Sequence, residues 1–253
     1  MRLQEARAIV TGAASGLGQH FAVQLARAGA CVAAGDVDVK GLERLSALAE
    51  GAPGAIWSSK LDVSQEASVT AFVKEASQKF NGINVVINNA GILRDGLLAT
   101  TEAGWIKKLP TAQWKQVLDV NLTGPYLVTR EVMGEVLTRG VKPSVVVNIS
   151  SISHDGNPGQ SNYSASKAGL DACTRTWALE LAKHGVRVGA VAPGVIETPM
   201  LKHISDDAMK SLVAGIPVGR IGQPEEVWQA VKFIIECDFF TGRVIEVDGG
   251  ASF

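Results

Sequence analysis

The chain has 253 residues, 46% of them hydrophobic and 19% charged, which is enough apolar material for a sizeable core and excludes a disordered chain. Its 24 Lys and Arg nearly balance its 25 Asp and Glu, and no segment concentrates one sign, so nucleic acid is not an expected partner. Folds of the α/β class often reach this length as one unit, and we expect residues 1–253 to form a single domain.

Cys31, Cys173 and Cys237 are widely separated and odd in number. Neither a disulfide framework nor a zinc site has this spacing, so we expect no metal and three small buried thiols in a reducing compartment, the cytoplasm. The strand-like run from Ala6 to Thr11 starts too early to follow a secretion leader. Apolar runs such as 145–147 are far shorter than the roughly 20 residues of a membrane-spanning helix, so membrane insertion is not expected.

Short apolar runs, taken in chain order, predict buried β-strands at Ala8–Val10, Cys31–Ala34, Ala55–Trp57, Val85–Ile87, Val145–Ile149, Val186–Val191 and Val244–Val247. Stretches of helical periodicity separate them; in the first, Leu17, Phe21 and Leu25 recur every four residues and Gly29 follows as a stop signal. This alternation predicts an α/β fold, a single-domain Rossmann-type doubly wound parallel sheet of about seven strands with helices on both faces. Ligands bind such sheets beyond the carboxyl ends of the strands, so motifs at strand ends carry the functional information.

A glycine-rich turn, residues 11–18, directly follows the first predicted strand and opens the first helix. Glycines remove Cβ atoms where the backbone must turn sharply and approach a pyrophosphate, and the helix N-terminus offers free N–H groups. The candidate cofactor contacts are Gly12, Ser15, Gly16, Leu17 and Gly18. Their spacing, Gly-x-x-x-Gly-x-Gly, differs from the Gly-x-Gly-x-x-Gly dinucleotide fingerprint, so an ordinary glycine-rich turn remains an alternative.

Asp36 ends the second predicted strand, about 20 residues beyond the glycine turn. An acidic side chain there can accept hydrogen bonds from the adenosine ribose hydroxyls, which favours NAD. It would repel the 2′-phosphate of NADP, and neither the turn nor residues 37–39 supply an Arg or Lys to offset its charge. The alternative is a surface Asp that only caps a helix.

Further motifs follow in order: Asn88-Asn89-Ala90-Gly91, Asn121, Ser150-Ser151, Tyr163-Ser164-Ala165-Ser166-Lys167, Pro193-Gly194 and Asp248-Gly249-Gly250. Together with the glycine turn, this ordered set resembles the short-chain dehydrogenase/reductase family over nearly the whole chain. The resemblance implies a nicotinamide cofactor, NAD in view of Asp36, and hydride transfer between that cofactor and a small-molecule secondary alcohol or ketone.

Tyr163 and Lys167 are four residues apart on a predicted helix, so their side chains share one face and can meet at one site. A free phenol has a pKa near 10 and is a poor base at neutral pH, but an adjacent ammonium and a nicotinium charge favour the phenolate. We therefore expect Tyr163 to act as the acid/base, with Lys167 lowering its pKa. The resemblance implies that Lys167 also holds the nicotinamide ribose.

Two serines compete for the role of orienting the substrate carbonyl. The family pattern at the strand end selects the second, Ser151, which we choose, whereas the usual spacing of thirteen residues before the Tyr selects Ser150. The resemblance also implies that Asn121 bends its helix and holds a water that links Lys167 to bulk solvent. A local kink without a catalytic part is the alternative for Asn121.

Other cofactor contacts come only from the resemblance, and they span the strand ends: Asp62, Val63, Asn89, Ala90, Gly91, Pro193, Gly194, Ile196 and Thr198. Pro193 and Gly194 would turn the chain and launch a lid over the substrate, the segment from Met200 to Ile216.

His154 and His203 flank the expected pocket, and we expect them to be solvent-facing loop residues because Tyr163 already supplies the acid/base. Trp105 lies in the long stretch from Leu97 to Leu109, where it would either wall the pocket or cover a subunit contact. Small residues on the helix after Tyr163 permit close helix packing: Ala165, Ala168, Gly169 and Ala172. The family usually forms dimers or tetramers, so we expect a homo-oligomer.

Residues 92–98 and 242–250 look like the 3-oxoacyl-thioester reductases of fatty-acid synthesis, which commonly use NADPH. Asp36 departs from that resemblance and keeps an NAD-linked 3-hydroxyacyl-CoA or secondary-alcohol dehydrogenase in view. A non-catalytic dinucleotide sensor would be expected to lack Tyr163 or Lys167, and both are present. A sugar-nucleotide epimerase or dehydratase would generally carry an added C-terminal domain.

Overall fold

The protein was analysed as a computed structural model, which describes residues 1–199, 201 and 206–251. Seven parallel strands form one sheet in the order β3-β2-β1-β4-β7-β8-β9. Their bounds are β1 Arg7–Thr11, β2 Cys31–Asp36, β3 Ala55–Lys60, β4 Val85–Asn88, β7 Ser144–Ile149, β8 Val186–Pro193 and β9 Val244–Val247. Each predicted strand lies within one of them, and the predicted Rossmann-type fold is confirmed.

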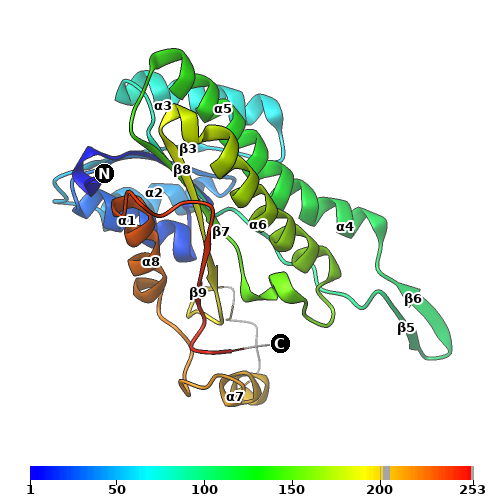
Figure 1. Cartoon of the computed structure of the whole chain (residues 1–253). Coiled ribbons are helices and arrows are strands. Elements are labelled where there is room, and N and C mark those ends of the chain that lie inside the picture. The colour runs from blue at the N-terminus through cyan, green and yellow to red at the C-terminus, as the bar shows by residue number, and fades with distance from the viewer. Residues whose placement is uncertain (200, 202–205, 252–253) are drawn as a thin grey trace.

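Helices cover both faces of the sheet (Figure 1). On one face lie α1 Gly16–Arg27, α2 Val39–Leu48 and α8 Pro224–Glu236; on the other lie α3 Glu66–Phe80, α5 Gly124–Arg139 and α6 Ser161–Leu181. The remaining helical elements are α4 Thr111–Leu118, α7 Asp206–Ala214, the π-helical turn η2 Asp119–Thr123 and the 3-10 turns η1 Leu3–Glu5, η3 Ile152–Asp155 and η4 Ala182–His184. The helix predicted from Leu17, Phe21 and Leu25 is α1, and Gly29 follows it with φ +91°.

Successive residues of a strand pack in two separate hydrophobic cores, one on each face of the sheet. Val145 and Val147 of β7 pack in the core beneath α1, α2 and α8, whereas Val146 packs in the core beneath α3, α5 and α6. Successive side chains of a strand point to opposite faces, and a parallel sheet covered on both faces must be apolar on both. This explains why the strands read as continuous apolar runs.

A buried polar network links the carboxyl ends of β4 and β7 to the helices behind them. The side-chain nitrogen of Asn88 donates to the side-chain oxygen of Asn148 at 2.8 Å and to the hydroxyl of Thr129 at 3.0 Å. The side-chain nitrogen of Asn148 in turn donates to the hydroxyl of Thr174 at 2.8 Å. All four residues are buried, so the network fixes α5 and α6 to β4 and β7.

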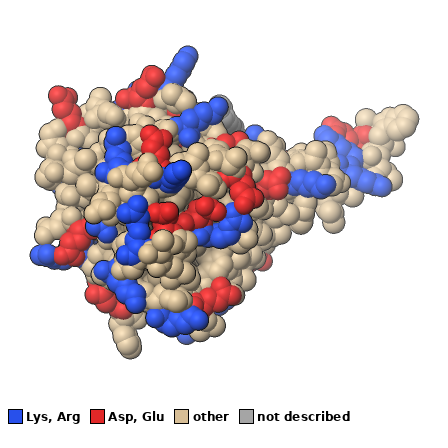
Figure 2. Space-filling view, turned by 90° about the horizontal axis from the view of Figure 1, so that it is seen from above, with Lys and Arg blue, Asp and Glu red and all other residues tan. Residues whose placement is uncertain are grey.

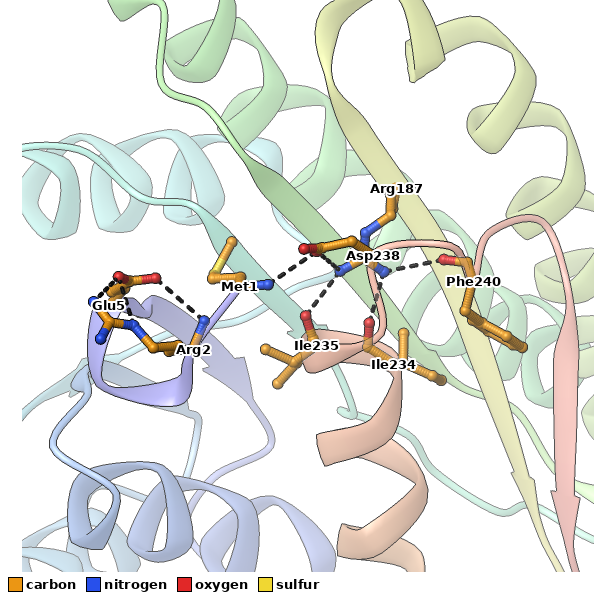
Figure 3. Close-up of polar contacts among 8 residues, drawn as sticks. All are labelled: Met1, Arg2, Glu5, Arg187, Ile234, Ile235, Asp238 and Phe240. Atoms are coloured by element: carbon orange, nitrogen blue, oxygen red, sulfur yellow. Dashed lines mark hydrogen bonds and ion pairs between the residues drawn. The ribbon is translucent and has the colours of Figure 1, made fainter.

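Arg187 of β8 fastens the C-terminal end of α8 to the sheet (Figure 3). Its guanidinium donates to the backbone oxygens of Ile234 and Ile235 at 2.7 and 2.8 Å and to that of Phe240 at 3.0 Å. The last carbonyls of a helix have no partner within the helix, so this side chain satisfies them. Asp238 lies beside the guanidinium, with its carboxylate 3.4 Å from Arg187, and burial lowers the pKa of Arg187.

A β-hairpin made of β5 Ala99–Glu102 and β6 Trp105–Lys108 was not predicted from the sequence. It projects from the body of the molecule at the right of Figure 1 and Figure 2. Ala103 and Gly104 join the strands with φ values of +50° and +82°, as a two-residue hairpin turn requires. Trp105 lies on this arm with 80% of its surface exposed and does not belong to the described lining of the pocket.

The surface and the cysteines bear on three further expectations. The face in Figure 2 intersperses Lys and Arg with Asp and Glu. Among the described residues, every helix is too short or too polar to span a bilayer. Cys31, Cys173 and Cys237 are free thiols, but each is partly exposed, so the expectation that they are buried was wrong. Cys31 begins β2, Cys237 follows α8 and Cys173 lies within α6, and the core covers none of the three side chains fully.

Candidate active site

A cavity of about 700 Å³ opens at the carboxyl ends of the strands, where β1 separates β2 from β4 and the order of strands reverses. The lining includes these predicted residues: Gly12, Ser15, Gly16, Leu17, Asp36, Asp62, Val63, Asn89, Ala90, Gly91, Ser151, Tyr163, Lys167, Pro193, Gly194, Ile196 and Thr198. Gly18 and Asn121 are predicted site residues outside this described lining. Both lie directly behind it, and their contacts explain why.

The glycine turn packs too closely for side chains. A Cβ on Gly18 would lie 2.2 Å from the backbone oxygen of Gly12 and 2.4 Å from the side-chain nitrogen of Asn89. Asn89 uses that nitrogen to donate to the backbone oxygens of Thr11 and Gly12 at 3.0 and 3.2 Å. Gly18 therefore brings the first turn of α1 against the loop, and Ser15, exposed at the N-cap, faces the cavity. This arrangement presents the N-terminus of α1 to an anionic group.

The carboxylate of Asp36 is held toward the cavity by two backbone N–H groups. Ala14 donates to one oxygen and Asp38 donates to the other, each at 2.9 Å. Each carboxylate oxygen has a second lone-pair direction, so both can still accept a hydroxyl. The capping role that the sequence left open belongs to Asp38, whose side chain accepts from the backbone N–H of Gly41 at the start of α2.

Tyr163, Lys167 and Ser151 meet in the inner part of the cavity. The Lys167 ammonium lies 5.5 Å from the centre of the Tyr163 ring and donates to the backbone oxygen of Ile149 at 2.7 Å. Burial lowers the pKa of Lys167 to about 8. The Ser151 hydroxyl hydrogen-bonds with the Tyr163 phenol.

The Tyr163 pKa responds to burial as well as to neighbouring charges. Burial raises it, and the hydrogen bond from Ser151 offsets only part of that rise. The sequence expectation rested on two positive charges near the phenol, the Lys167 ammonium and the nicotinium of a bound cofactor. It did not include the free energy needed to remove a phenolate from water. Burial thus favours the neutral form of the phenol.

The two candidate serines have different surroundings. Ser151 is the N-cap of η3, where its hydroxyl accepts from the backbone N–H of Ser153 at 3.1 Å as well as bonding Tyr163. The Ser150 hydroxyl is buried and finds no hydrogen-bond partner among the described residues. Only the Ser151 hydroxyl thus contacts the phenol in the part of the chain that the structure describes.

Asn121 is fully buried in the π-helical turn η2, which interrupts the passage from α4 to α5. Its side-chain oxygen accepts from the N–H of Ile92 at 2.8 Å, and its side-chain nitrogen donates to the carbonyl of Ile92 at 3.0 Å. These bonds fix the loop that follows Gly91 to the helix pair, and the π-helical turn shows that the expected helix distortion is present at Asn121. Its role toward a water stays a prediction.

One of the histidine expectations was wrong. His154 has a side chain only 11% exposed, and its Nδ1 hydrogen-bonds with a carboxylate oxygen of the buried Asp171 on α6. It neither faces solvent nor belongs to the described lining of the pocket. A loop histidine gives no sign in sequence that its partner lies seventeen residues later. His203 lies outside the described residues.

Part of the expected lid borders the cavity. Leu201 and Leu212 line it, the latter from α7, while residues 200 and 202–205 lie outside the described residues. Several other residues line the cavity around Tyr163 and were not predicted from the sequence as site residues: Ile92, Leu93, Asp95, Ile152, Asn157 and Gln160. These belong to loops that take their shape only on folding. The one available signal was their position next to the motifs.

Comparisons with known proteins agree with this geometry. A crystal structure described as a short-chain type dehydrogenase/reductase from Mycobacterium marinum superposes with a TM-score of 0.90 at 28% identity, covering 98% of this chain and 96% of the other. A family profile described as Enoyl-(Acyl carrier protein) reductase matches residues 12–252. The chain belongs to the short-chain dehydrogenase/reductase family.

Two curated members of the family illustrate the range of similar proteins. The 3-oxoacyl-(acyl-carrier-protein) reductase of Thermotoga maritima is 41% identical over 253 residues, covering 99% of each chain. The (3R)-3-hydroxyacyl-CoA dehydrogenase of Canis lupus familiaris is 37% identical over 263 residues, covering 99% of this chain and 97% of the relative. The predicted enzyme class, a short-chain dehydrogenase/reductase that acts on CH–OH groups with a nicotinamide dinucleotide, is confirmed.

The surroundings of the two serines lead to a first prediction. Ser151→Ala removes the hydroxyl that contacts Tyr163 and should lower kcat by about 10²- to 10³-fold, as the loss of one oxyanion donor does. Ser150→Ala is the matched control. It should change kcat by about threefold or less, because the Ser150 hydroxyl is buried and makes no hydrogen bond to any described residue. Steady-state kinetics on both variants would measure this, and a larger loss in Ser150→Ala would reverse the assignment.

Proposed function

We propose that this chain is an NAD(H)-dependent oxidoreductase that interconverts a ketone and a secondary alcohol on a 3-oxoacyl or 3-hydroxyacyl thioester, or on a similar small carbonyl compound. The meeting of Tyr163, Lys167 and Ser151 in one buried pocket carries the proposal. The thioester as substrate is supported by the two curated relatives, whose names specify 3-oxoacyl and 3-hydroxyacyl groups.

The side chains divide the proton chemistry among them. A bound nicotinamide dinucleotide would supply the hydride in reduction and accept it in oxidation. Tyr163 donates its phenol proton to the substrate oxygen in reduction and takes the alcohol proton in oxidation. Ser151 donates a hydrogen bond to the same oxygen, and the Lys167 ammonium stabilises the phenolate that Tyr163 becomes. Asn121 supports the wall beside Lys167 through its two bonds to Ile92.

The outer part of the pocket fits the dinucleotide. The N-terminus of α1 and the glycine turn at Gly12, Ser15, Gly16, Leu17 and Gly18 would hold the pyrophosphate. The other proposed contacts follow along the strand ends: Asp62, Val63, Asn89, Ala90, Gly91, Tyr163, Lys167, Pro193, Gly194, Ile196 and Thr198. Asp36, oriented by two backbone N–H groups, would accept the ribose hydroxyls, which supports NAD rather than NADP.

The assignment of Tyr163 predicts the effect of a single hydroxyl. Tyr163→Phe should lower kcat by about 10³-fold or more while NADH still binds with nearly unchanged affinity. Tyr126 is the only other tyrosine in the sequence and lies on α5 with 45% of its surface exposed, so Tyr126→Phe is the matched control and should retain full turnover. NADH fluorescence titration and the absorbance change at about 340 nm measure the two quantities. Retained turnover in Tyr163→Phe would remove the proposed mechanism.

The assignment of Asp36 predicts a change in cofactor preference. Asp36→Ala should lower the ratio of kcat/KM with NADH to that with NADPH by about 10- to 100-fold, because charged hydrogen bonds are lost and repulsion of the 2′-phosphate ends. Asp38→Ser retains a capping oxygen for α2 and should leave the ratio unchanged. An unchanged ratio in Asp36→Ala would place Asp36 outside the ribose site.

An NADPH-dependent 3-oxoacyl-(acyl-carrier-protein) reductase is the second candidate. It is favoured by the 41% identity to the Thermotoga maritima protein of that name. Initial rates with NADH and NADPH against acetoacetyl thioesters and simple ketones separate the two candidates. NADH preference supports the first, and NADPH preference moves the second ahead.

We also propose that the enzyme is a cytoplasmic homo-oligomer, a dimer or tetramer. Ala165, Ala168 and Ala172 form an exposed small-residue face on α6, and Leu179 lies on the same helix with 83% of its surface exposed. The unpaired cysteines agree with a reducing compartment. Sedimentation equilibrium should give two or four times the mass of one chain, and Ala168→Arg should lower it; a mass of one chain would contradict the assembly.

A further inference from the structure

A buried acid–histidine pair lies one helical turn beyond Lys167, outside the described lining of the cavity. Tyr163, Lys167 and Asp171 recur every four residues on α6, so they lie along one face of that helix. Asp171 is 5% exposed and Lys167 is 4% exposed. A carboxylate this deeply buried requires a partner, because its transfer from water is costly.

The partner of Asp171 comes from the element that carries the catalytic serine. Ser151 is the N-cap of η3, and His154 lies within that turn. The backbone N–H of His154 donates to the carbonyl of Ser151 at 3.0 Å. Its Nδ1 hydrogen-bonds with one carboxylate oxygen of Asp171, while the second oxygen is buried without a hydrogen-bond partner among the described residues. The pair therefore ties the serine loop to the helix that carries Tyr163 and Lys167.

Several carboxylates lie near this pair or act on Lys167 and Tyr163. Asp171 acts on Lys167, and the effect of its negative charge is to raise the Lys167 pKa against the larger lowering by burial. Asp95, which lines the cavity, raises the pKa of Tyr163 through its charge. The outer nitrogen of His154 lies 3.7 Å from a carboxylate oxygen of Asp155 and 3.8 Å from one of Glu246, both on exposed side chains.

We propose that Asp171, held in place by His154, is a positioning residue that keeps the buried Lys167 side chain in its charged form. The inference deepens the proposed function, on which its kinetic consequence rests. His154 supplies the hydrogen bond that holds the Asp171 side chain in place, and Asp171 supplies a negative charge that favours the ammonium form of Lys167, a side chain only 4% exposed. Neither side chain touches the reacting atoms.

The sign of the pH effect follows from this arrangement. An ammonium loses its proton as the pH rises through its pKa, and a nearby carboxylate moves that loss to higher pH. Removing the carboxylate therefore moves the loss to lower pH. In carbonyl reduction Lys167 must be charged to stabilise the phenolate that Tyr163 becomes, so the alkaline fall in rate should move the same way.

The test uses two variants of the pair and two matched controls. Asp171→Asn removes the charge and keeps a hydrogen-bond acceptor, whereas His154→Leu removes the hydrogen bond that holds the Asp171 side chain in place. His154→Asn places a side-chain N–H near the position of Nδ1 and is the conservative rescue. Glu246→Gln removes an exposed carboxylate near the same histidine.

The primary readout is the titration of the Lys167 side chain, followed by NMR on protein labelled at the lysine ε-carbon, with the signal assigned from Lys167→Arg. Asp171→Asn and His154→Leu should each lower the midpoint by about one pH unit, and the double variant should lower it no further. His154→Asn and Glu246→Gln should leave it unchanged. The alkaline limb of kcat for ketone reduction should shift by the same amount.

An unmoved Lys167 midpoint in Asp171→Asn overturns the proposal, even if that variant is less stable or less active at every pH. If Asp171→Asn does not fold, His154→Leu decides in the same way. The NMR titration needs no substrate, so it separates this inference from the proposed function. A shifted midpoint in a protein that reduces none of the ketones would support the role of Asp171 and contradict the reaction.

Discussion

The hydrogen bond from the Lys167 ammonium to the carbonyl of Ile149 joins the two parts of the active centre. Ile149 ends β7, and the two serines follow it directly, whereas Lys167 lies on α6 one turn after Tyr163. The same 2.7 Å bond therefore sets the helix that carries Tyr163 against the strand end that precedes Ser150 and Ser151. The bond also gives a partner to the ammonium of a side chain that is only 4% exposed.

Burial acts on the phenol and the ammonium in opposite directions on the pKa scale but favours the neutral form of both. It raises the pKa of Tyr163 and lowers that of Lys167 to about 8. Each group also has one neighbour that favours its charged form, the Ser151 hydroxyl for the phenol and the Asp171 carboxylate for the ammonium. A site in which solvent exclusion and specific neighbours oppose each other can change its protonation state at little cost, as proton transfer requires.

The sequence predicted most of the fold because its strands are covered on both faces and read as apolar runs bounded by glycine and polar motifs. The strand-end motifs predicted the pocket for the same reason, since parallel strands bring their carboxyl ends to one edge. The hairpin at Ala99–Lys108 was missed because four-residue exposed strands leave no periodic apolar signal. The contact of His154 with Asp171 was missed because it depends on how η3 folds back onto α6. The rise in the Tyr163 pKa was missed because burial is a property of the folded chain.

The paired asparagines at the ends of β4 and β7 have a consequence for how the sheet aligns. Val145, Val146 and Val147 are alike in size, so a slip of β7 by one residue would exchange valine for valine between the two cores. Apolar packing alone thus discriminates poorly between neighbouring alignments of this strand. Asn88 and Asn148 are register partners, and a slip would break the hydrogen bond between these two buried amides. The pairing of Asn88 with Asn148 therefore fixes the strand alignment that the uniform valines do not. Asn148 lies one residue before the end of β7, directly after which Ser150 and Ser151 follow.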